Sequence, residues 1–291
     1  MEKKWDGKTK GSLLGYKFFV FCIRFFGLKV SYFFCYFVSF YFILFAKKQR
    51  NGLLQFYMLG FGKTKNEAKK LAFKNFYHFG QTLIDRIAMH TSKRESFTHQ
   101  FNNEKVLRKM NDDNEGGILI SGHVGNWENA GNLIRERITS TINIVMLDAE
   151  VEKIKDFLAK QTEGQRYNLI PIKDDLSHLI LMHRALKRNE FIAIHADRVS
   201  DVGKNIELDF LNGKAEFPLG PFIMAHKFKA PITFVYAAKA TKFHYELYAT
   251  DPLTKTNSPE EVAQKYVTHL ESMVKKYPTQ WFNFYNFYAG E

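Results

Sequence analysis

The sequence predicts an α/β protein with a mostly parallel mixed sheet flanked by helices, preceded by apolar, membrane-associated helices at the N-terminus. Beyond residue 90, short apolar runs of strand type alternate with longer segments of helical period, the pattern of a parallel sheet with helices on both faces. Residues 13–46 are almost continuously apolar. A chain of 291 residues can bury one large domain and still carry an appendage. We therefore expect N-terminal anchor or interfacial helices over residues 1–50 and one domain over residues 51–291.

The N-terminal apolar stretch is interrupted by only three charges, Lys17, Arg24 and Lys29. The run from Val30 to Ala46 holds 17 uncharged residues, the short end of what crosses a bilayer core of roughly 30 Å. No small-residue cleavage site follows Phe45, which argues against a secretory signal. A buried core helix is the alternative. We expect a spanning anchor or a helix that lies in the membrane interface, where aromatic and basic side chains are favoured.

Basic residues flank both ends of this stretch. They are Lys3, Lys4, Lys8 and Lys10 on one side and Lys47, Lys48 and Arg50 on the other. The positive-inside rule therefore gives no orientation. The two cysteines, Cys22 and Cys35, lie inside the stretch. They do not form a C-x-x-C pair and no histidine cluster is near them in the sequence, which is typical of packing residues.

The rest of the chain divides into predicted helices and strands. Apolar residues from Asn66 to His90 recur with helical period. Strands are expected at Gly117–Ser121, Ile142–Leu147, Leu169–Ile172, Phe191–His195, Ile206–Phe210 and Ile232–Ala237. Further helices are expected near Asn126–Arg137, Glu150–Thr162, Asp175–Arg188, Gly220–Phe228 and Pro259–Lys276. Alternation in Lys242–Thr250 predicts an antiparallel edge strand.

The charge balance favours anionic partners. Forty-two basic residues against 30 acidic ones give a formal charge of +12, which attracts phospholipid headgroups, nucleic acid or an acidic carrier protein. No zinc-finger spacing or nucleic-acid motif accompanies the charge, and the aromatics gather in the apolar stretch instead of interleaving with basic residues. We therefore expect no nucleic-acid partner.

Residues 120–131, ISGHVGNWENAG, join a predicted strand to a predicted helix. His123 directly follows the strand, and sites in open α/β sheets gather at the carboxyl ends of strands. Glu128 comes five positions later, about 140° away from His123 on a continuous helix. The two side chains meet only if the chain turns between them. Gly122 and Gly125 permit that turn, and Asn126 is a suitable helix cap.

A histidine held by a carboxylate suits general-base chemistry. The carboxylate fixes the tautomer and makes the other ring nitrogen a better acceptor for the proton of an alcohol. The alcohol then attacks a thioester directly, without an enzyme nucleophile, and positive groups or backbone N–H donors stabilise the oxyanion. The alternative is that His123 is a capping or packing residue and that Glu128 is an acid favoured by a helix N-terminus.

These segments resemble a known family. SGHVGNWENAG resembles the H-x-x-x-x-[DE] motif of the lysophospholipid acyltransferase superfamily, and most resembles the lauroyl and myristoyl acyltransferases of lipid A biosynthesis. Further resembling segments follow in order along the chain. They are Ala193–Arg198, Asp209–Lys214, Phe217–Phe222, Ala230–Ile232 and Pro278–Trp281.

The resemblance implies a glycerolipid acyltransferase-like fold and an acyltransferase at the cytoplasmic face of the inner membrane. The donor would be an acyl carrier protein thioester, or CoA, and the acceptor a hydroxyl of a lipid or glycolipid such as a lipid A precursor. His123 would be the base and Glu128 its orienting partner. The substrate-binding residues would be Gly125, Asn126, Asp197, Arg198 and Gly220. The resemblance implies no cofactor and no metal.

Some residues leave alternatives open. Arg198 suits phosphate or an oxyanion, or else a structural pair with Asp197 or Asp201. His195 and Asp197, with His123 and His183, form an alternative metal-binding set. The family's Trp-x-His-Arg-Arg ending is replaced here by Phe-Asn-Phe-Tyr-Asn-Phe-Tyr after Trp281.

The N-terminal sequence also leaves the acceptor open. Residues 5–11, WDGKTKG, look more like relatives that accompany aryl-polyene or flexirubin-type pigment assembly. A different lipid acceptor is therefore one alternative. A catalytically inactive membrane lipid-binding protein and a lipid esterase are the others, although no G-x-S-x-G elbow occurs.

Overall fold

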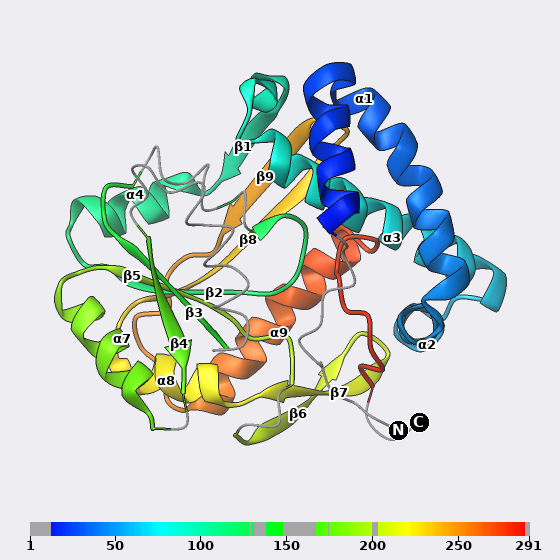
Figure 1. Ribbon diagram of the computed structural model, residues 1–291. Coiled ribbons are helices and arrows are strands. Elements are labelled where there is room, and N and C mark those ends of the chain that lie inside the picture. The colour runs from blue at the N-terminus through cyan, green and yellow to red at the C-terminus, as the bar shows by residue number, and fades with distance from the viewer. Residues whose placement is uncertain are drawn as a thin grey trace.

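A computed structural model describes residues 13–127, 130, 138–147, 167–173, 175–199 and 203–288 of the chain. Its helices are α1 (Leu13–Phe45), α2 (Lys47–Phe61), α3 (Lys65–Ala88), the short 3₁₀ helix η1 (Ser92–Ser96), α4 (Glu104–Asp112), α7 (Ser177–Lys187), α8 (Gly220–Phe228) and α9 (Pro259–Lys276). Its strands are β1 (Thr98–Asn102), β2 (Gly117–Ser121), β3 (Ile142–Leu147), β4 (Tyr167–Ile172), β5 (Phe191–His195), β6 (Asn205–Phe210), β7 (Gly213–Pro218), β8 (Ile232–Thr241) and β9 (His244–Ala249). Figure 1 shows their arrangement.

A seven-stranded sheet organises the molecule, in the order β1-β9-β8-β2-β5-β3-β4. All neighbouring strands are parallel except β8 and β9. Helices cover the sheet, as Figure 1 shows. The predicted fold class is therefore confirmed. β2, β5, β3, β4 and β8 are parallel to one another, so their carboxyl ends lie along the same side of the sheet. Residues that follow these strands gather there.

Continuous apolar runs gave the best strand predictions. β2, β3, β5, α8 and α9 have the predicted bounds. Of the predicted helices, Glu150–Thr162 lies outside the described residues, and so does most of Asn126–Arg137. The predicted antiparallel strand is β9, but it is not an edge because β1 pairs with its free side.

The prediction that Ile206–Phe210 belongs to the main sheet is wrong. This segment, as β6, forms a separate two-stranded antiparallel sheet with β7. Exposed and half-buried residues alternate along β6, so one of its faces is turned to solvent. An alternating pattern predicts a strand but does not identify its partner.

Local signals set the ends of two long helices. α3 begins with a capping box, in which the Thr64 hydroxyl accepts from the Glu67 N–H and the Glu67 carboxylate accepts from the Thr64 N–H. α9 begins after Ser258, whose hydroxyl accepts from the Glu261 N–H, and Pro259 occupies its first turn.

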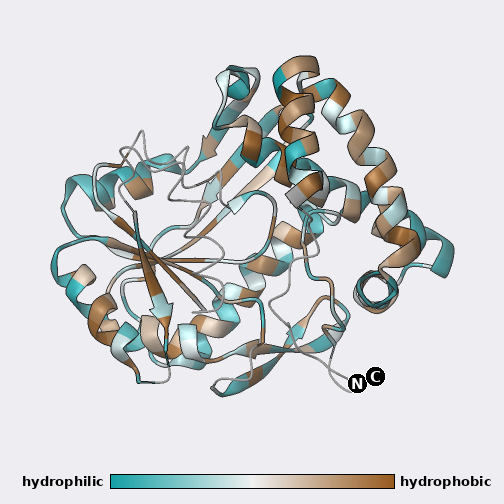
Figure 2. Cartoon of the chain, in the orientation of Figure 1, coloured by the Kyte–Doolittle hydropathy of each residue, from teal (hydrophilic) through white to brown (hydrophobic). Residues whose placement is uncertain are grey.

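The N-terminal helix α1 is apolar over most of its length. Among the described residues it is the one helix long and apolar enough to cross a membrane by those two criteria. Gly27 interrupts it with φ 78° and ψ −177°, a conformation that L side chains rarely adopt. Figure 2 shows the hydrophobic colouring of α1 at the outside of the molecule, next to α3. α1 packs against α3 and contributes Ile23, Leu28 and Tyr32 to a buried cluster.

Candidate active site

The loop after β2 places His123 at the carboxyl edge of the sheet. β2 is buried at every residue and ends at Ser121. Gly125 then adopts φ 67° and forms a bridge to Ala237 of β8. A Cβ on Gly125 would lie 2.0 Å from the Ala237 carbonyl oxygen, so only glycine allows this close approach. The chain therefore turns at Gly125, one of the two glycines proposed for the turn, whereas Glu128 beyond it lies outside the described residues.

The C-terminal segment of the chain holds this loop from the other side. Val124 bridges to Trp281, the Gly125 N–H donates to the Gln280 carbonyl at 2.8 Å, and the Phe282 N–H donates to the His123 carbonyl at 2.9 Å. The aromatic residues after Trp281 are core residues, since Phe282, Tyr285, Phe287 and Tyr288 are buried. The position of His123 is thus fixed by backbone hydrogen bonds to residues near the end of the chain.

The carboxylate of Asp197 holds His123. His123 Nδ1 lies 2.7 Å from Asp197 Oδ1, and the His123 backbone N–H donates to Oδ2 at 2.6 Å. The indole N–H of Trp281 donates to the same Oδ2 at 2.8 Å. β2 and β5 are neighbours with Ser121 opposite His195, which explains how residues 74 positions apart meet.

The charge state of Asp197 fixes the histidine tautomer. Burial raises the pKa of Asp197, but its interaction with His123, the hydrogen bond between them and the charge of Arg198 lower it more, so that it lies well below its usual range. An ionised carboxylate only accepts hydrogen bonds, so His123 Nδ1 carries the proton and donates it. The lone pair is then on Nε2, which is the basic nitrogen of this tautomer.

The pair is asymmetric in its exposure. The His123 side chain is 12% exposed, whereas that of Asp197 is 1% exposed. The imidazole therefore reaches the surface while the carboxylate behind it is sealed from water. This arrangement suits proton exchange between the imidazole and a bound molecule, while the charge of the Asp197 carboxylate stays out of solvent.

Two aromatic rings surround the imidazole. The rings of Trp127 and His195 lie 4.8 and 4.6 Å from that of His123. Burial and the neighbouring His123 lower the pKa of His195 to about 3, so His195 is neutral near pH 7. Its Nδ1 is enclosed and has no hydrogen-bond partner among the described residues.

The other predicted site residues have varied positions. Arg198 donates from Nη2 to the Phe282 carbonyl at 3.0 Å, and its charge lowers the pKa values of Asp197 and His195. Asn126 is buried and directs its amide to the Thr82 carbonyl and the Tyr245 hydroxyl, 3.4 and 3.3 Å away. Gly220 begins α8 in open space. Glu128 lies outside the described residues, so its role as the partner of His123 stays a prediction.

The metal-binding alternative gains no support from the described part of the chain. No three His, Cys, Asp or Glu residues within it are arranged to hold a metal ion. His183 instead lies on α7 with its ring 6.1 Å from that of Phe228.

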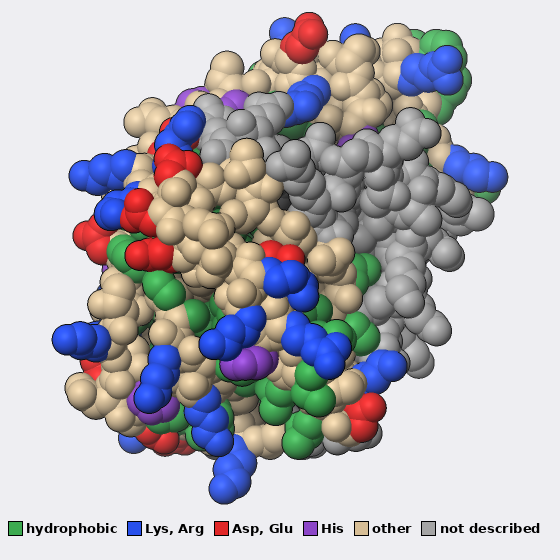
Figure 3. Space-filling view, turned by 90° about the vertical axis from the view of Figure 1, so that its left-hand side faces the viewer, with side chains coloured by type: hydrophobic (Ala, Val, Ile, Leu, Met, Phe, Trp, Pro, Cys, Tyr) green, Lys and Arg blue, Asp and Glu red, His purple; other side chains and the backbone are tan. Residues whose placement is uncertain are grey.

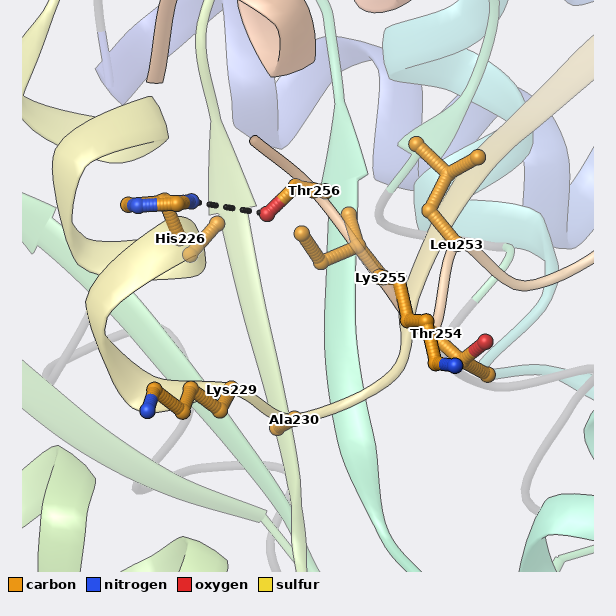
Figure 4. Close-up of a pocket in the computed structure, with 9 residues that line it drawn as sticks. His226, Lys229, Ala230, Leu253, Thr254, Lys255 and Thr256 are labelled. Atoms are coloured by element: carbon orange, nitrogen blue, oxygen red, sulfur yellow. Dashed lines mark hydrogen bonds between the residues drawn. The ribbon is translucent and has the colours of Figure 1, made fainter. Parts of the chain in front are cut away.

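A surface pocket lies at the opposite edge of the sheet. Its lining includes His226, Lys229 and Lys255, and His226 Nδ1 lies 2.8 Å from the Thr256 hydroxyl, as Figure 4 shows. Ile232, at the start of β8, also lines it. Ile232 pairs with Ile118 near the start of β2, whereas His123 follows the end of β2. The pocket is therefore separate from the histidine site.

Sequence reasoning missed the role of Trp281 and of Tyr266. Trp281 appeared only within a family-like segment, with no function attached. The hydroxyl of Tyr266, on α9, donates to the Ser121 carbonyl at 3.0 Å and supports the end of β2. No spacing signal links either residue to His123, because both lie more than 140 positions away along the chain.

Comparison with known families gives one match over nearly the whole chain. The sequence model of the family described as bacterial lipid A biosynthesis acyltransferase matches residues 10–288. The match includes every residue of the His123 site described above. No curated protein sequence matches the chain.

Proposed function

Because this chain belongs to the bacterial lipid A biosynthesis acyltransferase family, we propose that it transfers a fatty acyl group from a thioester to a hydroxyl of a lipid or glycolipid. His123 is the general base, and Asp197 is the carboxylate that orients it. The 2.7 Å contact between His123 Nδ1 and Asp197 Oδ1 is the observation that carries this proposal. In this tautomer the basic nitrogen is Nε2, and the imidazole that carries it is partly exposed.

The reaction proceeds in two steps. The acceptor hydroxyl gives its proton to His123 Nε2 while its oxygen bonds to the thioester carbonyl carbon, forming a tetrahedral oxyanion. The oxyanion then collapses, the carbon–sulfur bond breaks, and the leaving sulfur takes the proton from Nε2. An ester and a free thiol result, and His123 returns to its starting state. Asp197 stays ionised throughout and stabilises the imidazolium that forms between the steps.

Arg198 supplies positive charge beside the His123–Asp197 pair. It follows Asp197 directly, and its charge acts on both Asp197 and His195. One N–H of its guanidinium donates to the Phe282 carbonyl. The planar, permanently charged guanidinium group is suited to binding a phosphate or an oxyanion. We assign that role to Arg198.

The surface charge suits an acidic donor protein. The net charge is +12, and Lys and Arg side chains are prominent on the face that carries α7 and α8, as Figure 3 shows. On these helices they include Arg184, Lys187 and Lys227, and Lys229 directly follows α8. Complementary charge accelerates encounter with an acidic partner. We therefore propose acyl carrier protein as the donor and the cytoplasmic face of the inner membrane as the location.

A single assay tests the proposal. The purified protein is incubated with acyl carrier protein thioester and a total lipid extract, and products are identified by mass spectrometry. We expect a lipid heavier by one acyl group, absent with His123→Ala. His183→Ala, which changes an exposed histidine on α7, serves as the matched control and should retain the product.

Other outcomes point to other functions. A lipid that loses an acyl group would identify an esterase. Lipid binding without any new product, by a folded protein, would identify a lipid-binding protein that lacks the chemistry. The mass of the acylated product identifies the acceptor, whether a lipid A precursor or a pigment-type lipid.

A further inference from the structure

The N-terminal helix α1 is bent back on itself. Gly27 leaves helical geometry and divides α1 into a first arm, residues 13–26, and a second arm, residues 28–45. The rings of Phe18 and Phe34 lie 5.4 Å apart, edge to face. Residues 16 positions apart on a straight helix are separated by about 24 Å, so this contact requires the two arms to diverge from a sharp bend. Figure 1 shows the two arms of α1 meeting at an angle.

The second arm is attached along its length to the rest of the protein. One stripe of it is buried, consisting of Leu28, Ser31, Tyr32, Cys35 and Ser39. Their spacing of three and four residues places them on one helical face. The Tyr32 hydroxyl donates to Asp85 of α3 at 2.5 Å, and the Tyr36 ring lies 5.0 Å from that of Phe73.

The opposite face of this arm is aromatic and exposed. It contains Phe33, Phe37, Phe40 and Leu44, which are 58, 55, 52 and 47% exposed. The first arm adds Phe21, Phe25 and Phe26, each more than half exposed. We refer to these seven residues as the aromatic face of α1. Ring contacts join Phe33 to Phe37 and Phe21 to both Phe25 and Phe26. Clustered exposed apolar side chains of this kind mark an interaction site.

We propose that the aromatic face of α1 inserts into a single leaflet of anionic lipid and that α1 does not cross the bilayer. The second arm is about 27 Å long at 1.5 Å per residue, less than a bilayer core of roughly 30 Å. Exposed Lys17, Arg24 and Lys29 interrupt the arms, at positions suited to anionic headgroups. A helix that crossed the core would have to leave its contacts with α3.

This arrangement explains why basic residues flank both ends of the apolar stretch. If α1 stays in one leaflet, the lysines before residue 13 and those at the start of α2 are on the same side of the membrane. The positive-inside rule then applies to both groups together. The inference does not depend on acyl transfer, because its readouts are topology and lipid binding.

Two labelling experiments test the topology with full-length protein in membranes. Arg24→Cys and Lys47→Cys, made separately, are treated with a membrane-impermeant maleimide in inverted and in right-side-out vesicles. We expect both to react only in inverted vesicles. The unsubstituted chain measures the background from Cys22 and Cys35, which are buried. Reaction of the two positions from opposite sides would overturn the proposal.

The bend is tested by cross-linking. Phe18→Cys/Phe34→Cys should be bridged within one chain by a short bifunctional maleimide in membranes, whereas the control pair Phe18→Cys/Leu44→Cys should not. A straight membrane-spanning helix would leave the first pair unbridged, and that result would contradict the proposal.

The lipid partner is tested by vesicle sedimentation. Phe33→Gln/Phe37→Gln/Phe40→Gln should lose most binding to phosphatidylglycerol vesicles, and the unsubstituted chain should bind phosphatidylcholine vesicles less well. Leu176→Gln/Ile180→Gln removes one exposed apolar residue just before α7 and one within it, and this variant should bind normally. Unchanged vesicle binding by the triple variant would overturn the proposal. A triple variant that loses self-association but keeps lipid binding would also overturn it.

Discussion

Two carboxylates are buried in the described part of the chain, and they differ in what surrounds them. Asp197 accepts hydrogen bonds from a histidine and an indole, and its histidine reaches the surface. Asp85 is fully buried between α1, α3 and the sheet, and accepts from Lys239, Tyr32 and Tyr245. Burial raises the pKa of Asp85 in spite of Lys239, and burial lowers the pKa of Lys239.

The difference separates a chemical role from a structural one. At Asp197, favourable contacts outweigh the cost of burial, so the carboxylate stays charged. One of its partners, His123, is partly exposed. At Asp85, every described partner is itself buried, and the group joins α1 to the sheet. Asn126 links the two regions, because it lies three residues after His123 and its amide donates to the hydroxyl of Tyr245, a partner of Asp85.

The largest expected effect on stability is at the Asp85 cluster. Lys239→Met leaves a buried carboxyl without its cation and should lower the free energy of unfolding by about 3–5 kcal/mol. Adding Asp85→Asn should recover much of that loss, since no buried charge then remains. Chemical denaturation of both variants and of Asp85→Asn alone measures this. A loss in the double variant equal to the sum of the losses in Lys239→Met and Asp85→Asn would show that the pair is not coupled.

Gly125→Ala should disturb both regions together. The new Cβ would meet the Ala237 carbonyl, and φ 67° disfavours a side chain, so we expect a loss of about 2–5 kcal/mol and a large loss of activity. Gly220→Ala is the matched control, because nothing lies within 4 Å of its added Cβ. If Gly220→Ala loses activity at normal stability, Gly220 contacts substrate, as the sequence predicts. A fully active Gly125→Ala enzyme would contradict the described turn.

The two regions should respond to pH in opposite senses. His195 has a pKa of about 3 when folded and about 6.5 when unfolded, so the unfolded chain binds more protons between these values. Above pH 6.5 this difference costs no stability. As the pH drops from 6.5 toward 3, it lowers the free energy of unfolding by about 1.4 kcal/mol per pH unit. Because the pKa of Asp197 is lowered in the folded protein, its protonation at still lower pH also reduces the free energy of unfolding. The pKa of Asp85 is raised, so protonation of Asp85 as the pH falls removes a buried charge and increases the free energy of unfolding.

Variants separate these contributions. His195→Gln should flatten the acid side of a plot of unfolding free energy against pH, and Asp85→Asn should steepen it. Parallel curves for His195→Gln and the unsubstituted protein would show that His195 titrates normally.

The smallest expected effects come from removing one donor from each carboxylate. Trp281→Phe and Tyr32→Phe each delete a hydrogen bond to a carboxyl group, for a loss of about 1.5–3 kcal/mol. Only Trp281→Phe should also lower activity, because it removes a hydrogen bond to the carboxylate that holds His123. Activity lost equally in both folded variants would mean that the two carboxylates do not have separate roles.

The sequence predicted elements that are buried or capped better than those that are exposed. β2, β3 and β5 are short runs of apolar residues with clear ends, and their bounds were predicted to the residue. β1 was missed because its sequence, THQFN, is largely polar, as suits a strand at the sheet edge. The bend of α1 is not predicted, because Gly27 lies within an apolar run and the charge pattern divides the stretch at Lys29.

The site was predicted only in part, for a topological reason. His123 could be identified from the strand that precedes it. Asp197 was named, but as a substrate-binding residue or metal ligand, because a single sequence does not reveal that β5 neighbours β2. Trp281 lies 84 positions from Asp197, and nothing in local spacing relates them. Residues that meet only through strand order require the structure.

The most direct test of the Asp197–His123 pair is the activity of Asp197→Asn beside Asp85→Asn. An amide next to Nδ1 permits the wrong histidine tautomer, so Asp197→Asn should lower kcat by about 10²–10⁴ while the protein remains folded by circular dichroism. Asp85→Asn, at the other buried carboxyl, should retain activity close to that of the unsubstituted enzyme. A folded Asp197→Asn protein with normal kcat would contradict the assignment of Asp197 as the orienting partner of the catalytic base.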